Sequence, residues 1–296
     1  MARRINESFI NELKKGSLSP ILDYVVNDDT LNMELRGDRI IVYYRGGALF
    51  SVLEDKYAFE GMDKNYFQTH APLIPSLLTI EDYIPKAKHF IDLYVRQSRN
   101  HLGEKEIQQQ IARENNYSPN SLDTDFFVID VEYQDLGRFD IVALCWDSTS
   151  TARKLAQSYL PKITIFEVKQ GYSTSSGTSG LKKHFEDFCI FTEKDEAVKS
   201  FKEDMIVVFR QKRKLGLIDG MGKYKDIKSV AEDIDFVFLM ANYKSKSSVV
   251  KSELELIKAE DYKIAPKFIY ANSMGYGLFA RNIISGEEFV NSFLCE

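Results

Sequence analysis

The spacing of apolar residues changes along the chain in a way that predicts an α/β protein. Apolar residues recur at helical intervals over 5–15 and 19–27, which predicts two short amphipathic helices. The pattern then changes to alternation, which predicts three strands separated by glycine-containing turns. These strands are expected over 31–35, 39–44 and 48–53. A helix over 84–99 follows, so we expect a smaller N-terminal α+β domain over 1–100, to which no motif assigns a role.

Residues 101–296 form the second predicted domain, in which helical and strand patterns are mixed. A helical pattern over 103–115 is followed by three apolar strands and then by a helix over 181–191. The three strands are expected over 126–134, 138–146 and 162–170. Further elements are expected over 198–215 (helix), 234–241 (strand), 247–259 (helix) and 267–271 (strand). The predicted core is therefore helix, three strands, helix and a further strand.

Charged residues interrupt two of these apolar strands. Asp140 lies in the segment GRFDIVA, and Glu167 and Lys169 lie in the segment FEVKQG. Because alternate residues of a strand point to opposite faces, Glu167 and Lys169 share one face. A buried charge is costly unless it is paired or binds a metal. We therefore expect these three side chains to form a site for a divalent cation.

The order of elements and these three residues resemble the PD-(D/E)XK nuclease superfamily, whose members have the restriction-endonuclease-like fold. The resemblance covers residues 103–191. The first acid of the family motif falls on Asp140, and the second acid and the lysine fall on Glu167 and Lys169. The long spacer between Asp140 and Glu167 departs from the pattern, and the subfamily is not identified. The resemblance implies an α/β protein with a restriction-endonuclease-like core.

An additional acid of this family lies on the helix before the strands, and Glu104 matches it best. The stretch EKEI that begins at Glu104 resembles the Glu-x-Glu-Leu pattern of archaeal Holliday-junction resolvases in this superfamily. Glu106 is the competing assignment. We prefer Glu104 because its spacing from Ile107 and Ile111 puts its carboxylate on the side of these buried isoleucines.

The resemblance implies a Mg²⁺-dependent endodeoxyribonuclease that acts on DNA in repair, restriction or defence against foreign DNA. Hydrolysis of a phosphodiester needs a hard cation that lowers the pKa of the attacking water. Magnesium takes oxygen ligands and few carboxylates, so we expect Asp140, Glu167 and the backbone carbonyl of Val168 to bind Mg²⁺, for which Mn²⁺ would substitute. Glu104 would complete the shell directly or through water. Lys169 would orient the water or stabilise the developing negative charge.

Several polar residues near this site are candidates for contacts with DNA. Gln170 follows Lys169, and Lys182 and Lys183 open a helix, where backbone N–H groups favour a phosphate. The helix over 198–215 ends in a basic cluster that either contacts DNA or complements the helix dipole. Its members are Arg210, Lys212, Arg213 and Lys214. The polar loop over 171–180 lacks the spacing of a phosphate-binding loop, so we expect no nucleotide cofactor.

Composition narrows the class of protein only slightly. The formal net charge of −5 argues against a surface that is basic throughout, but not against a local basic cleft. We expect a cytoplasmic protein with no membrane partner, because no apolar run reaches the length of a membrane span or resembles a signal peptide. The cysteines show no CxxC spacing, and the four histidines show no paired ligand spacing that would indicate zinc. These residues are Cys145, Cys189, Cys295, His70, His89, His101 and His184.

Two alternatives stay open in the sequence. The first is a catalytically inactive nuclease-fold module that binds nucleic acid or a protein partner, in which the acids are structural. The second concerns Asp130 and Glu132, which we interpret mainly as a solvated face, although one turn register places Glu132 beside Asp140. A homodimer is compatible with cleavage of both DNA strands, which needs two active sites, but no interface is evident in the sequence.

Overall fold

The computed structural model describes residues 2–66, 75–97, 103–117, 123–154, 160–170, 177, 180–218, 227–243, 248–260, 262–272 and 274–294. Within them the chain is a mixed α/β protein with one four-stranded and one six-stranded sheet. The chain divides into two compact units. The first comprises Met1–Arg113 and Val207–Asp219, and the second comprises Glu114–Ile206 and Gly220–Glu296.

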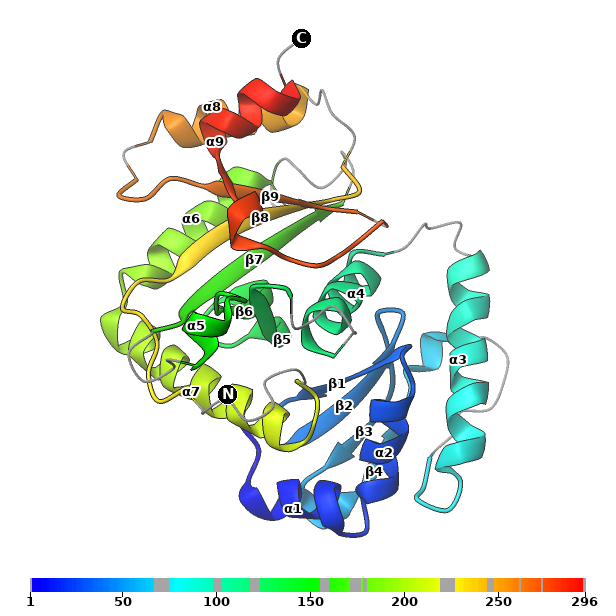
Figure 1. Cartoon of the computed structure of the whole chain (residues 1–296). Coiled ribbons are helices and arrows are strands. Elements are labelled where there is room, and N and C mark those ends of the chain that lie inside the picture. The colour runs from blue at the N-terminus through cyan, green and yellow to red at the C-terminus, as the bar shows by residue number, and fades with distance from the viewer. Residues whose placement is uncertain are drawn as a thin grey trace. The chain divides into compact units, whose positions relative to one another are not determined.

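The first unit contains an antiparallel sheet of order β1-β2-β3-β4 (Figure 1). Its strands are β1 (Leu31–Leu35), β2 (Arg39–Tyr44), β3 (Gly47–Leu53) and β4 (Phe59–Gly61). Its helices are α1 (Glu7–Lys15), α2 (Ser19–Asn27), α3 (Ile80–Gln97) and two 3₁₀ turns, Asp55–Tyr57 and Lys64–Tyr66. The strands and helices predicted before residue 54 are confirmed. Strand β4 was not predicted, because three residues are too few to show alternation.

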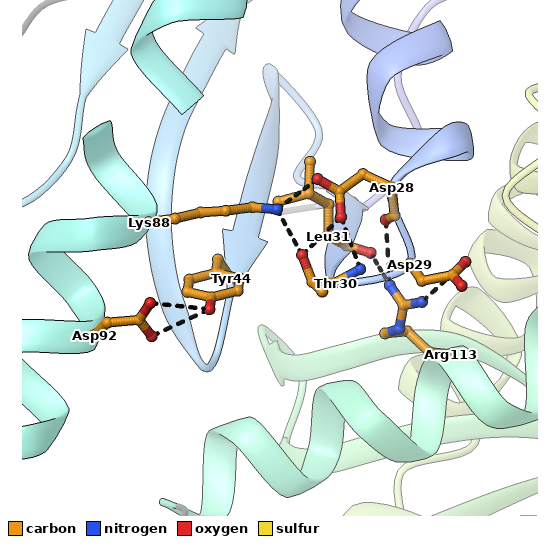
Figure 2. A network of polar contacts seen from close by, with 8 residues as sticks. All are labelled: Asp28, Asp29, Thr30, Leu31, Tyr44, Lys88, Asp92 and Arg113. Carbon is orange, nitrogen blue, oxygen red and sulfur yellow. Dashed lines mark hydrogen bonds and ion pairs between the residues drawn. The ribbon is translucent and has the colours of Figure 1, made fainter. Parts of the chain in front are cut away.

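Charged side chains connect α3 to the loop before β1 (Figure 2). Lys88 of α3 donates hydrogen bonds to Asp28 and to Oγ1 of Thr30. Arg113 donates to the carbonyl of Leu31 at 2.7 Å. Burial opposes ionisation of Asp28, but the hydrogen bonds from Lys88 and Thr30 outweigh it and hold the pKa of this carboxyl below its usual value. The network therefore fixes the entry to the sheet through ionised groups.

The second unit contains a mixed sheet of order β10-β9-β8-β7-β6-β5 (Figure 1). Strands β5, β6 and β7 are antiparallel neighbours, whereas β7, β8 and β9 run parallel. The strands are β5 (Phe126–Gln134), β6 (Arg138–Cys145), β7 (Lys162–Gln170), β8 (Asp235–Ala241), β9 (Lys267–Ala271) and β10 (Ile284–Ser285). The helices are α4 (Glu104–Asn116), α5 (Ser150–Lys154), α6 (Leu181–Thr192), α7 (Asp195–Lys214), α8 (Ser248–Lys258) and α9 (Gly286–Phe289), with short turns at Ala280–Asn282 and Val290–Leu294. The predicted helix, three strands, helix and further strand occur in that order along the chain, with α5 between β6 and β7 and α7 before β8. Helices α4 and α7 each contribute residues to both units.

Helix α6 covers one face of the six-stranded sheet, the face to which Ile165 of β7 points. Phe236 of β8 lies beside Ile165 of β7 in the parallel register, so both side chains point to this face. Phe188 of α6 stacks on Phe236 with ring centroids 4.8 Å apart, and Phe185 lies at 5.8 Å. Because Glu167 and Lys169 follow Ile165 at steps of two, their side chains point toward α6 as well.

A single cut near residue 100 does not describe the two units, because the end of α7 belongs to the first of them. The side chain of Gln211 accepts from the backbone N–H of Ile5 at 3.1 Å and donates to its carbonyl at 2.6 Å. Lys212 forms a buried ion pair with Glu34 at 2.8 Å. These contacts join α7 to the N-terminal segment. Among the described residues, no helix has the length and apolar character needed to cross a membrane.

Candidate active site

A hydrogen bond joins the start of β6 to β7 beside Glu167. The paired register of the two strands ends at Ile141 and Phe166, which are the sequence neighbours of Asp140 and Glu167. Asp140 Oδ2 accepts a hydrogen bond of 2.8 Å from the backbone N–H of Val168. The carboxylate of Asp140 is therefore held against the strand that carries Glu167.

The backbone N–H and carbonyl groups of Val168 both point toward β6. The N–H and C=O groups of one strand residue point toward the same neighbouring strand. Since the N–H of Val168 bonds to Asp140, its carbonyl is also directed toward β6. The Val168 side chain is fully buried on the opposite face of the sheet. The carboxylate of Asp140 and the backbone of Val168 therefore meet where β6 and β7 separate.

Glu167 and Lys169 form a buried ion pair, as their spacing predicts. Lys169 Nζ donates to Glu167 Oε1 at 2.8 Å, and the two side chains are 3% and 4% exposed, respectively. His184 Nε2 of α6 lies 3.1 Å from the same Glu167 oxygen. A buried ion pair is stable only when further polar contacts compensate for lost hydration, and His184 lies close enough to Glu167 to contribute one.

The sequence did not identify His184 as part of the site, because a single histidine shows no ligand spacing. Its position in the helical pattern carries a weaker signal. His184 lies three residues after Leu181 and four before Phe188, both fully buried, so it belongs to the face of α6 that contacts the sheet. A polar residue on that face is expected to meet a polar partner on the sheet.

The surroundings of His184 disfavour its charged form. Burial, followed by the charge of Lys169, lowers the pKa of His184 to about 4. Its Nε2 nevertheless approaches Oε1 of Glu167 to 3.1 Å.

Glu104, the preferred helix acid, and Glu106, its alternative, have different surroundings within the first unit. Glu104 is the first residue of α4 and is partly exposed. Glu106 is buried and accepts a hydrogen bond of 2.9 Å from Arg45. The carboxylate of Glu106 is thus engaged in an ion pair. Glu106 is also the more buried of the two acids, although we expected Glu104 to lie on the buried side of the helix.

The two lysines that open α6 are in ion pairs. Lys182 Nζ contacts Glu260 at 2.9 Å, and Lys183 pairs with Asp187. The backbone N–H of Lys182 donates to Glu253 Oε2 of α8 at 3.0 Å. A carboxylate thus occupies the position where we expected this helix end to favour a phosphate.

The basic residues at the end of α7 differ in burial and in their partners. Lys212 is 1% exposed and pairs with Glu34, so its ammonium does not lie on the surface. Lys214 is exposed and pairs with Glu7, while Arg210 and Arg213 are partly exposed. Burial of Lys212 contradicts its assignment as a DNA contact. Gln170, at the end of β7, is partly exposed.

The two further acids on β5 differ in burial. Asp130 is 1% exposed, so the expectation that it belongs to a solvated face is wrong. Glu132 is partly exposed and lies between the pairs Val131–Ile141 and Tyr133–Phe139, which places it opposite Asp140 in the register. Its φ of 58° is in the left-handed region that non-glycine residues rarely adopt.

The donor set suits a hard cation. In the described part of the chain, no group of three or more histidine, cysteine, aspartate or glutamate side chains is placed to hold a metal ion. Asp140, Glu167 and the carbonyl of Val168 offer only oxygens, and Mg²⁺ uses one or two carboxylates while keeping several waters.

No protein-family model matches this chain, and neither does any curated protein or solved structure.

Proposed function

We propose that this protein is a Mg²⁺-dependent nuclease of the PD-(D/E)XK type that hydrolyses phosphodiester bonds in DNA. The observation that carries the proposal is that Asp140 binds the backbone N–H of Val168, next to Glu167, whose carboxylate pairs with Lys169. The order of helix, three strands and helix supports a restriction-endonuclease-like core. The partly exposed basic residues of α7, Arg210 and Arg213, together with Lys182 and Lys183 of α6, are the proposed DNA contacts.

Each residue of the site has a defined role in this proposal. Asp140, Glu167 and the Val168 carbonyl would hold Mg²⁺. When bound, the ion neutralises charge on the phosphoryl oxygens and lowers the pKa of the attacking water. The ammonium of Lys169 has three N–H donors, so it can keep one on Glu167 and direct another to the attacking water or a phosphoryl oxygen. Charge stabilisation of this kind contributes about 10²–10³-fold in rate.

Cleavage of supercoiled plasmid DNA in Mg²⁺ tests the proposal. Asp140→Asn removes a ligand charge and Lys169→Met removes the ammonium, and each is expected to reduce the cleavage rate about 100-fold or more. Lys162→Met is the matched control, because Lys162 opens the same strand and pairs with Asp233. It is expected to cleave like wild type. The proposal fails if wild type cleaves neither plasmid, linear, single-stranded nor branched DNA, or if Lys169→Met cleaves like the control.

A module that binds without cleaving is the second candidate. Two observations favour it: Glu167 and Lys169 neutralise each other in a buried pair, and Lys182, Lys183, Lys212 and Lys214 all pair with acids. On this alternative, DNA or a protein partner would bind without turnover. In a gel-shift assay, the affinity of such a module for DNA would not change with Mg²⁺ or with Asp140→Asn. The affinity of a metal-dependent nuclease for DNA would change with both.

A further inference from the structure

We propose that Arg138 binds a phosphate of the DNA backbone beside the candidate active site. This inference rests on the function proposed above, because it takes DNA as the substrate. Arg138 is the first residue of β6 and its side chain is exposed. It precedes Asp140 by two residues of the same strand. Because alternate residues of a strand point to one face, the side chains of Arg138 and Asp140 leave the sheet on the same side.

The charge of Arg138 also acts on helix α6. Burial and the charge of Lys169 lower the pKa of His184 most, and the charges of Arg138 and Lys183 lower it further. His184 itself lies 3.1 Å from Glu167. Cations from three elements, β6, β7 and α6, therefore lie near one side chain of the candidate site.

These three cations differ in their partners. Lys169 pairs with Glu167 at 2.8 Å, and Lys183 pairs with Asp187. Within the described part of the chain, no hydrogen bond or ion pair engages the guanidinium of Arg138. A phosphate must displace a carboxylate to reach either lysine, whereas it meets no such competitor at Arg138. The formal net charge of the chain is −5, so attraction of DNA to this site needs a local cation of this kind.

The guanidinium group suits a phosphate ligand and gives the contact a measurable signature. Its planar fork donates two parallel hydrogen bonds to phosphate oxygens. Each phosphate that a protein neutralises on duplex DNA adds about 0.9 to the steepness with which log K falls with log salt concentration. Loss of one contact therefore changes the salt dependence of binding, which a purely structural role of Arg138 would leave unchanged.

Fluorescence anisotropy of a labelled DNA duplex, measured with the full-length protein at several salt concentrations and without divalent metal, tests the contact. Arg138→Gln is expected to weaken binding about tenfold at low salt and to reduce the salt slope by about 0.9. Arg138→Lys keeps the charge, so it is expected to keep the wild-type slope.

Arg281→Gln is the matched control, because it removes the same charge from another exposed arginine of the second unit. Arg281 follows Ala280, whose N–H bonds to Asp125 just before β5, whereas Arg138 pairs with Gln134 at the far end of that strand. Arg281→Gln is expected to bind DNA like wild type.

The possible outcomes separate this inference from the proposed function. If wild type cleaves DNA and Arg138→Gln keeps the wild-type affinity and salt slope, the phosphate contact is refuted and the nuclease stands. Equal losses in Arg138→Gln and Arg281→Gln, or a reduced slope in Arg138→Lys, refute the contact too. If binding depends on Arg138 but wild type cleaves no DNA, the contact stands and the nuclease is overturned. Absence of duplex binding by wild type overturns the contact.

Discussion

Asp140 Oδ2 accepts a hydrogen bond of 2.8 Å from the backbone N–H of Val168, which ties the end of β6 to β7. Asp140→Ala leaves this part-buried N–H without its acceptor, and we expect a loss of about 1–3 kcal/mol in the free energy of unfolding. Asp140→Asn keeps a carbonyl acceptor and is expected to lose less than about 1 kcal/mol. Urea unfolding measures both values. Equal losses in the two variants would show that this hydrogen bond does not stabilise the strand ends.

The buried pair of Glu167 and Lys169 gives a second prediction. Lys169→Met leaves Glu167 buried without its cation and is expected to cost about 3 kcal/mol or more. The double variant Glu167→Gln/Lys169→Met removes both charges, so it is expected to be more stable than Lys169→Met alone. Guanidinium unfolding of the wild type, the two single variants and the double variant gives the coupling energy. Additive losses would contradict a direct interaction between the two side chains.

Lys212 and Lys214 lie on the same helix and are predicted to behave differently. Lys212→Met leaves Glu34 buried without its ion-pair partner and is expected to cost about 3 kcal/mol. Lys214→Met, at an exposed pair with Glu7, is expected to cost less than about 1 kcal/mol. Urea unfolding compares them. Similar small losses in both variants would place Lys212 on the surface and return it to the proposed DNA contacts.

The stability contributed by Asp28 is predicted to depend on pH. Because its folded-state pKa is held below the usual value, its contribution is fully present above the ordinary aspartate pKa of about 3.9 and is lost as pH falls through the lower folded-state pKa. Asp28→Asn is therefore expected to cost about 1–2 kcal/mol at pH 7, and progressively less below about pH 4. Asp29→Asn is the control, since Asp29 is 96% exposed. A pH-independent loss in Asp28→Asn would contradict the ionised network of Figure 2.

The strands that carry the candidate site could be predicted because their signal is local. Alternating apolar residues define β5, β6 and β7 within a few residues of the observed ends. The shared face of Glu167 and Lys169 follows from their spacing of two, and the contact between their side chains confirms it. Helix α6 was predicted from its own apolar spacing, but the side chain that it presents to the sheet was not recognised.

Contacts between distant segments could not be predicted. The 3.1 Å contact between His184 and Glu167 depends on how α6 packs on the sheet, which no local pattern specifies. Lys212 looked like part of a basic surface because its sequence neighbours are basic, yet its partner Glu34 lies 178 positions away. The same long-range contacts place the end of α7 in the first unit. Burial and partner choice are decided by tertiary packing, which periodicity does not reveal.

Anomalous diffraction from crystals soaked in Mn²⁺ is the most direct test of the metal site. We expect an anomalous peak bounded by the carboxylates of Asp140 and Glu167 and the carbonyl of Val168, and no such peak in crystals of Asp140→Asn. A peak at another place, or none at Mn²⁺ concentrations that support DNA cleavage, would contradict the assignment of these residues as the metal-binding centre of a nuclease.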